Sequence, residues 1–233
     1  MKERIREIIT NPIIVILLIA FAVSGVIIYG ISSNMAEQKS EIVNSLDISS
    51  VSRDKDGKLI VKLTDYEALR DETNFLTAVS PNVSSSGQLI AGNNNYPASV
   101  NGVSTEYLEI RQLSVESGEM FTEADIQNAA KVCIIGKTIV DNLFPNGQNP
   151  IGHIIRFNQV PLRVVGVLKA KGYNSMGMDQ DEIVLAPYTT VMKRMLAVTY
   201  LQGIFASALS EDMTDYATDE ITTILRRNHK LKE

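Results

Sequence analysis

The sequence predicts an α+β domain that follows an N-terminal transmembrane helix. Residues 13–31 form an apolar stretch without a charged side chain, and the rest of the chain has ordinary globular composition. Beyond that stretch, short alternating runs are mixed with capped helical segments. They lack the regular strand-helix-strand order of a parallel α/β fold. With 45% apolar and 21% charged residues, the chain has enough apolar side chains to bury a core, so a disordered chain is excluded.

The apolar stretch is long enough to cross a bilayer as a helix. At about 1.5 Å per residue, residues 13–31 extend roughly 28 Å, which matches the roughly 30 Å hydrocarbon core. Lys2, Arg4 and Arg6 precede it, and basic residues favour the cytoplasmic side. We therefore expect a single span within residues 1–31 of a bacterial inner membrane protein, with residues 32–233 periplasmic or extracellular. The alternative is a cleaved signal peptide, whose apolar region is shorter, about 7 to 15 residues.

Charge and cysteine content exclude several classes of function. The net charge is −5, of which residues 1–31 contribute +1 and the remaining residues −6. Nucleic-acid binding needs clustered Lys and Arg, so no nucleic-acid partner is expected. Cys133 is the single cysteine and lies in the apolar run VCII, where it is expected to be buried. His153 and His229 are the two histidines, and no Cys/His zinc spacing exists, so no cofactor or metal site is predicted in this chain.

The first elements after the apolar stretch are read from periodicity and capping. Residues 32–46 carry the apolar residues Met35, Ile42, Val43 and Leu46, which predict that this stretch continues the membrane helix as an amphipathic stalk. Residues 59–63 alternate as a strand does. Thr64 and Glu67 have the spacing of a capping box, which predicts a helix over residues 65–76.

The following region contains short strand-like pieces. Turn-rich runs, SSSG at 84–87 and GNNN at 92–95, separate these pieces. The later signals are stronger, because each has an apolar pattern, a cap or a breaker. They predict a helix over 122–128 with Thr122 as its cap, a buried strand over 131–136, a helix over 137–144 and a hairpin of 154–158 with 162–168. A strand over 183–186, a helix over 187–196, a strand over 203–209 and a helix over 215–227 follow.

The motif Gly136-Lys137-Thr138 matches the end of a nucleotide-binding phosphate loop. That loop needs a glycine five residues earlier, where this chain has Lys131. We therefore interpret Gly136 as the passage from a strand into a helix.

Two acidic clusters are the other candidates for chemistry. They consist of Asp179, Asp181 and Glu182, and of Glu211, Asp212, Asp215, Asp219 and Glu220. Paired carboxylates hydrolyse glycosides or bind calcium, but neither cluster has the calcium-loop spacing. No Gly-x-Ser-x-Gly elbow singles out a serine, and His153 is expected to face solvent. We predict no catalytic residue, and an extracytoplasmic hydrolase using the acidic clusters remains an alternative.

The glycine-rich segment GYNSMGMDQD, residues 172–181, is the candidate contact site. It carries Tyr173, Met176 and Met178, and methionines on an exposed loop make adaptable contacts with other proteins. The alternative is a hairpin tip whose methionines fold back onto the core.

Several blocks of the outer region, in this order, resemble the periplasmic core domain of MacB-type ABC transporter permeases. The blocks are VNGVSTEYLEIRQLSVESGEMF at 100–121, KVCIIGKTIVDNLF at 131–144, NPIGHIIRFNQVPLRVVGVLKAKG at 149–172, DQDEIVLAPYTTV at 179–191 and EITTILRRNHK at 220–230. The resemblance implies a mixed α/β Porter-like subdomain over 47–91 and 166–233. A mainly β Sabre-like subdomain over 92–165 is inserted in it.

The resemblance also implies a function and partners. A permease subunit of this kind works as a dimer and transmits motion driven by ATP and Mg²⁺ on a partner ATPase. A membrane-fusion adaptor or a substrate carrier protein completes the assembly, for efflux, peptide export or lipoprotein release. The chain has neither the ATPase nor the later membrane helices of a complete permease, so we expect it to be a fragment of a longer protein. A membrane-anchored binding or sensing module without an ATPase is the competing interpretation.

Overall fold

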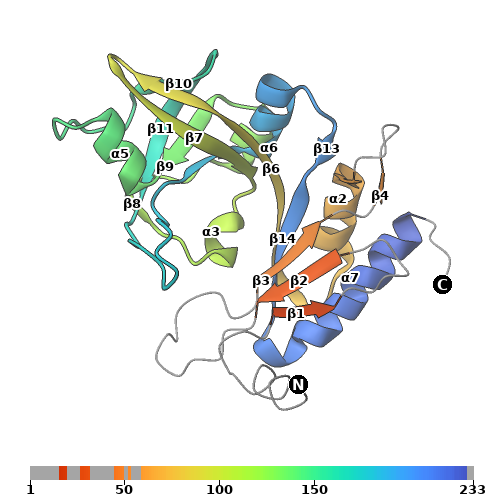
Figure 1. Ribbon diagram of the computed structural model, residues 1–233. Coiled ribbons are helices and arrows are strands. Elements are labelled where there is room, and N and C mark those ends of the chain that lie inside the picture. The colour runs from red at the N-terminus through yellow and green to blue at the C-terminus, as the bar shows by residue number, and fades with distance from the viewer. Residues whose placement is uncertain (1–15, 20–26, 32–44, 50–51, 54–58, 230–233) are drawn as a thin grey trace, which may run out of the picture.

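One long strand, β6 (Leu76–Ala91), connects the two parts of the fold. The computed structural model describes residues 16–19, 27–31, 45–49, 52–53 and 59–229, with side chains from residue 61 onward. In Figure 1, β6 runs from a layer of strands and helices below into a second group of strands above. Its first half pairs with β14 and its second half with β7, so a single strand belongs to both parts.

The lower part is an antiparallel sheet beside two helices. The strand order is β1, β2, β3, β14 and β6. Helices α2 and α7 contact each other and lie next to this sheet (Figure 1). The strands are β1 (Ile16–Ile19), β2 (Ile27–Ile31), β3 (Ser45–Ser49) and β14 (Gly203–Ala208), and the helices are α2 (Leu63–Glu72) and α7 (Thr214–Asn228). Three short strands pair beside them: β4 (Ser52–Arg53), β5 (Leu59–Lys62) and β13 (Tyr200–Leu201).

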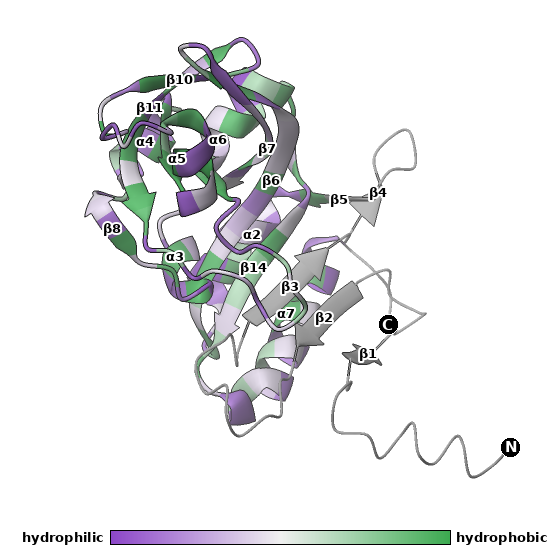
Figure 2. Ribbon diagram, turned by 60° about the vertical axis from the view of Figure 1, so that its left-hand side comes forward, coloured by the Kyte–Doolittle hydropathy of each residue, from purple (hydrophilic) through white to green (hydrophobic). Residues whose placement is uncertain are grey.

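The upper part is a closed sheet, because its pairings return to the strand where they begin. The order is β6, β10, β11, β9, β12, β7 and again β6. Its other strands are β7 (Asn94–Val103), β9 (Val132–Ile135), β10 (Ile154–Phe157), β11 (Val160–Leu168) and β12 (Val184–Pro187). Figure 2 shows hydrophobic and hydrophilic residues alternating along elements of this part. The alternation places one set of side chains inside.

Short elements surround the closed sheet. They are α3 (Tyr107–Ile110), β8 (Val115–Gly118), α4 (Glu123–Gln127), α5 (Lys137–Leu143), α6 (Tyr188–Thr190), the π-helix η1 (Val191–Leu196) and the 3₁₀ turn η2 (Glu211–Met213), which leads into α7. One cluster of buried apolar residues extends through both parts. It joins Phe157 in the closed sheet to Leu69 and Ile221 on the helices below. Burying each such side chain stabilises the fold by about 1.5 to 3 kcal/mol.

The prediction that SSSG at 84–87 forms a turn is wrong, because these residues lie in the middle of β6. Two side chains complete the hydrogen bonding of this polar stretch. The Gln202 Oε1 atom accepts from the Ser84 N–H at 3.0 Å, and its Nε2 donates to the Ser84 carbonyl at 2.9 Å. The Asn158 Oδ1 atom accepts from the Gln88 N–H at 3.0 Å. Serines fit the strand here because side-chain amides take the place of a neighbouring strand.

Helix α2 begins and ends earlier than its sequence predicts. The expected cap, Thr64, is not the cap: the helix starts at Leu63, and the Asp65 carboxylate accepts from the Lys62 N–H at 2.8 Å. The helix ends at Glu72, because Thr73 is extended and the next residues enter β6. Asp65, at the third helical position, takes the capping role predicted for Glu67, and its carboxylate also contacts the buried His229 side chain.

For residues 122–227, the type and approximate position of each remaining predicted helix and strand are confirmed. Thr122 caps α4, where its hydroxyl accepts from the Asp125 N–H at 3.2 Å. The predicted strand at 131–136, the helix at 137–144 and the 154–168 hairpin correspond to β9, α5 and β10–β11. The predicted strands at 183–186 and 203–209 are β12 and β14, and the predicted helix at 187–196 is divided into α6 and η1. Helix α7 buries the four residues of its apolar face, Ala217, Ile221, Ile224 and Leu225.

The expected transmembrane helix over residues 13–31 is not seen where the structure describes this stretch. Residues 16–19 and 27–31 are the paired strands β1 and β2, and the rest of the stretch lies outside the described residues. No described helix has both the length and the apolar character needed to cross a membrane. The predicted stalk also lies outside the described residues, apart from residues 45 and 46, which are in β3.

The buried contact between Asp65 and His229 joins the start of α2 to the residue after α7. The His229 Nε2 atom lies 2.8 Å from Asp65 Oδ2 and 2.9 Å from Asp65 Oδ1, and both side chains are almost fully buried. We expect Asp65→Asn to lower the free energy of unfolding by roughly 3 kcal/mol, because changing one member of a buried pair leaves the other without its partner.

The measurement is chemical denaturation of the purified chain, followed by circular dichroism. Glu67→Gln is the matched control, since Glu67 is exposed on the same helix. An unchanged stability of Asp65→Asn would mean that the pair does not hold the two helices together.

Candidate functional site

The loop between β11 and β12 presents three apolar side chains to solvent. Tyr173 is 74% exposed, Met176 79% and Met178 56%. The interpretation in which the methionines fold back onto the core is therefore wrong. A contact of these side chains with a partner stays a prediction.

The tip of this loop is held in one conformation by Asn174. Its Oδ1 atom accepts from the N–H groups of Met176 at 3.0 Å and Met178 at 2.9 Å. The Asn174 N–H also donates to the Met178 carbonyl at 2.9 Å. Gly177 permits the tight reversal, because its φ of +75° is a conformation that other residues rarely adopt. The methionines thus project from an ordered turn.

The acidic residues of the loop serve to hold its base. Asp181 is buried, and its carboxylate accepts from the N–H groups of Lys171 at 2.8 Å and Gly172 at 2.9 Å. Asp179 accepts from the Thr138 hydroxyl at 2.6 Å and from the Asp181 N–H at 2.8 Å. Each oxygen of the two carboxylates accepts a hydrogen bond from a protein donor, which gives both side chains a structural role.

The second acidic cluster lies around the start of α7. Within it, Glu220 accepts from the backbone and side chain of Asn74. Within the described part of the chain, no group of three or more His, Cys, Asp or Glu residues is arranged to hold a metal ion.

The Gly136-Lys137-Thr138 motif is the start of a helix, as predicted. Gly136 precedes α5, where a Cβ atom would lie 2.2 Å from the Asp181 carbonyl oxygen, so only glycine fits. The Lys137 ammonium pairs with Asp141 at 2.6 Å, and the Thr138 hydroxyl donates to Asp179. Both polar side chains of the motif therefore have partners within the protein.

The predictions for His153 and Cys133 are confirmed. His153 is exposed and meets the Phe144 ring edge-on, with 5.6 Å between ring centroids. Cys133 is completely buried in β9, and burial raises the pKa of its thiol, because the thiolate would lose its hydration.

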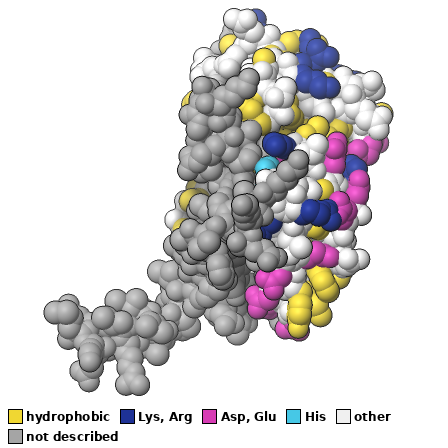
Figure 3. Space-filling model, turned by 90° about the vertical axis from the view of Figure 1, so that its right-hand side faces the viewer, with side chains coloured by type: hydrophobic (Ala, Val, Ile, Leu, Met, Phe, Trp, Pro, Cys, Tyr) yellow, Lys and Arg dark blue, Asp and Glu magenta, His cyan; other side chains and the backbone are white. Residues whose placement is uncertain are grey.

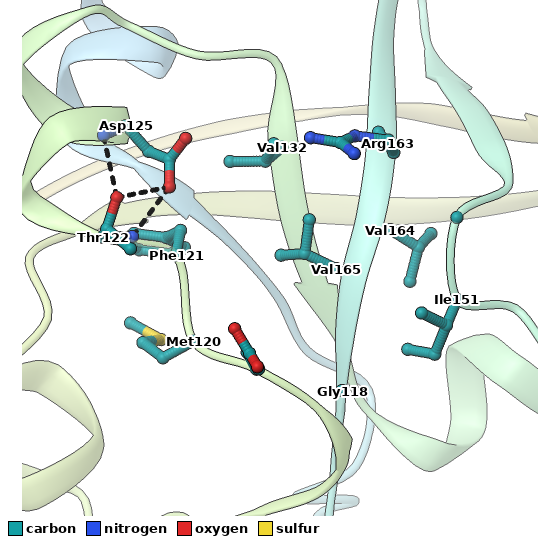
Figure 4. Close-up of a pocket in the computed structure, with 12 residues that line it drawn as sticks. Gly118, Met120, Phe121, Thr122, Asp125, Val132, Ile151, Arg163, Val164 and Val165 are labelled. Carbon is teal, nitrogen blue, oxygen red and sulfur yellow. Dashed lines mark hydrogen bonds between the residues drawn. The ribbon is translucent and has the colours of Figure 1, made fainter.

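A pocket that the sequence does not reveal lies between β11 and residues 118–125. Its volume is about 360 Å³. Figure 4 shows Met120, Val165 and Ile151 around it, and the hydrogen-bonded Thr122 and Asp125 at one end. Sequence patterns miss it because it depends on the antiparallel pairing of β8 with β11, which lie far apart along the chain. A Cβ atom on Gly118 would lie 2.2 Å from the Val165 carbonyl oxygen, and one on Gly166 would lie 2.6 Å from that of Glu119.

Comparison with known proteins decides the family. The family described as "MacB-like periplasmic core domain" matches residues 9–224. This chain belongs to that family. It is therefore a MacB-like periplasmic core domain of a MacB-type ABC transporter permease.

The curated relatives of this MacB-like domain are much longer proteins. The chain is 39% identical over 161 residues to "Macrolide export ATP-binding/permease protein MacB" of Syntrophobacter fumaroxidans. The match covers 69% of this chain and 22% of the relative. The protein of the same description in Chlorobaculum tepidum is 38% identical over 167 residues, which cover 72% of this chain and 25% of that relative. The matched region thus spans about a quarter or less of these relatives.

Two solved structures share the fold. The periplasmic region of MacB from Actinobacillus actinomycetemcomitans has a TM-score of 0.70 at 23% identity, and the match covers 84% of this chain and 89% of that one. The extracellular domain of the ABC-type transporter YknZ from Gram-positive bacteria has a TM-score of 0.67 at 19% identity, covering 82% and 97%. The prediction of a MacB-type periplasmic core domain is confirmed, with a mixed α/β fold.

The buried thiol gives a direct test of the closed sheet. We expect Cys133 in the native chain to react with a thiol reagent at about pH 8 at least tenfold more slowly than in concentrated guanidinium. The thiolate is the reactive form, and burial both raises the thiol pKa and blocks access. The measurement is the rate of colour release from an aromatic disulfide reagent. Equal rates in the two conditions would contradict the burial of β9.

Proposed function

We propose that this domain transmits the motion of a partner ATPase to other proteins during export across the cell envelope, and that it catalyses no reaction itself. The observation that carries the proposal is the match of a MacB-like periplasmic core domain to residues 9–224. The relatives are named as macrolide export proteins. We extend to this chain the export role alone.

The proposal assigns ATP and Mg²⁺ to an ABC ATPase domain or subunit outside this chain. It anchors the full-length protein in the bacterial inner membrane and places the folded domain in the periplasm. It also includes a homodimer of the full-length protein and a membrane-fusion adaptor or a substrate carrier protein. The Porter-like and Sabre-like subdomains, at 47–91 with 166–233 and at 92–165, belong to the same proposal.

The packing supports a role in transmitting motion. Both parts share β6 and one continuous apolar core, which includes Leu89 and Phe157 above and Leu69 below. Close-packed interiors resist deformation and transmit strain. A displacement of the lower part therefore carries the closed sheet with it.

The loop of Tyr173, Met176 and Met178 supports a contact with another protein. Its apolar side chains are exposed, yet Asn174 and Asp181 fix the backbone that carries them. A fixed backbone reduces the entropy lost on binding. Methionine side chains adapt their shape to a partner.

The proposed function is tested by cross-linking in native membranes with a tagged full-length protein. We expect an ABC ATPase to be recovered with it, together with a membrane-fusion adaptor if the system is an efflux pump. Recovery of an ATPase with a soluble lipoprotein carrier would instead indicate lipoprotein release. Absence of any ATPase would overturn the proposal and favour a binding or sensing module that works alone.

The loop is tested separately with the double substitution Met176→Ser and Met178→Ser. We expect the affinity for the adaptor or carrier to fall by about a hundredfold or more, since each methionine buried on binding contributes on the order of 1.5 to 3 kcal/mol. The melting temperature should stay unchanged, because both side chains are exposed. Asn174 is left intact so that the turn persists. Unchanged recovery would remove the loop from the contact surface.

A further inference from the structure

An apolar patch lies where α7 begins, on the lower part of the fold. It consists of Phe75, Leu209, Met213 and Tyr216, and is called the α7 patch below. Leu209 is 52% exposed and Tyr216 59%, while Phe75 and Met213 are half-buried. Figure 3 shows hydrophobic side chains beside acidic ones at the lower end of the described surface. Large apolar side chains grouped on a surface indicate an interaction site.

The backbone beneath the α7 patch is fixed by hydrogen bonds. The Leu209 N–H donates to the Phe75 carbonyl at 3.0 Å, and the Glu220 carboxylate accepts from the Phe75 N–H at 3.2 Å. The rings of Phe75 and Tyr216 lie 5.8 Å apart, measured between centroids. The backbone of the α7 patch is thus already fixed in the unbound domain, which lowers the entropy lost on binding.

Four exposed carboxylates lie beside the α7 patch along the chain. Glu211 and Asp212 precede α7, Asp215 is in its first turn, and Asp219 follows one turn later. No described Lys or Arg lies within ion-pair distance of these four residues. The helix dipole stabilises a carboxylate in the first turn, as at Asp215, but its effect fades beyond that turn and leaves Asp219 unexplained.

We propose that the α7 patch binds a segment of another protein in which an apolar side chain is flanked by Lys or Arg. The apolar side chain would cover Tyr216 and Leu209, and the flanking cations would meet Asp212 and Asp219. The surrounding charge disfavours the other occupants. An anionic lipid surface would be repelled, and a second copy of the patch would bring like charges together. The inference goes beyond the proposed function, which assigns no contact to α7.

The test places a photoreactive phenylalanine analogue at position 216 of the full-length protein in living cells. After illumination, the cross-linked peptide is identified by mass spectrometry. The expected product is a segment of another protein with an apolar residue and at least one adjacent Lys or Arg. Products with lipid, with a second copy of this chain or with a segment lacking cations would overturn the proposal, as would no product at all.

Charge reversal separates electrostatic binding at the α7 patch from nonspecific hydrophobic association. Asp212→Lys with Asp219→Lys should lower the cross-linking yield by about tenfold, since cationic side chains then repel the segment. Both positions avoid the first turn of α7. Glu116→Lys is the matched control, an exposed reversal on β8 that should leave the yield unchanged. Equal yields for the double variant and the control would overturn the proposal.

A second measurement applies if the double variant does not fold. In membranes from cells with the unaltered α7 patch, raising the salt concentration to about 1 M shortens the screening length to roughly 3 Å and should reduce the yield severalfold. A yield independent of salt would contradict a cationic partner. Recovery of an ATPase is read from a different experiment, so failure here and failure of the proposed function are distinguishable.

Discussion

The fold depends on how the hydrogen bonds along one edge of β6 are satisfied. Alternate residues of a strand point their backbone groups to the same edge. On β6 this edge is covered by β14 near Asn82 and by β10 near Ile90, with a polar stretch between. Gln202 and Asn158 reach into that stretch and bond to Ser84 and Gln88. Without these side chains the strand would expose an open edge, which invites association with other strands.

The same arrangement explains why glycine stands at a central position of the strand. A Cβ atom on Gly87 would lie 2.5 Å from the Asn158 side chain. The Asn158 amide therefore reaches the Gln88 N–H only because residue 87 has no Cβ atom. Pro97 on β7 lies opposite Gln88 and has no N–H to donate. The missing donor fits a pairing in which the backbone of Gln88 points to the other edge, towards Asn158. The apparently turn-like composition is therefore the composition that a strand shared by two sheets requires.

The sequence predicted correctly those helices and strands whose caps, apolar periodicity or turns lie within a few residues of one another. Thr122, the apolar face of α7 and the hairpin of β10 with β11 each have a cap, a period or a turn within a few residues. The sequence could not show Gln202 beside Ser84 or His229 beside Asp65, because more than a hundred residues separate these partners. For the loop, composition predicted Tyr173, Met176 and Met178 as a candidate. It could not settle their exposure, which depends on Asn174 and on Asp181 holding the base.

The distribution of fixed and exposed groups fits the proposed transmission of motion. One apolar core joins α7 to the closed sheet, so the loop and the α7 patch are carried by the same packed body. Each surface pairs exposed apolar side chains with a backbone fixed by a buried or bonded carboxylate, Asp181 in the loop and Glu220 at the α7 patch. A flexible backbone under these surfaces would deform when the domain moved, and less of the motion would reach a bound partner. Asp179, Asp181 and Glu220, which the sequence offered as candidates for catalysis, instead stiffen the surfaces through which force would pass.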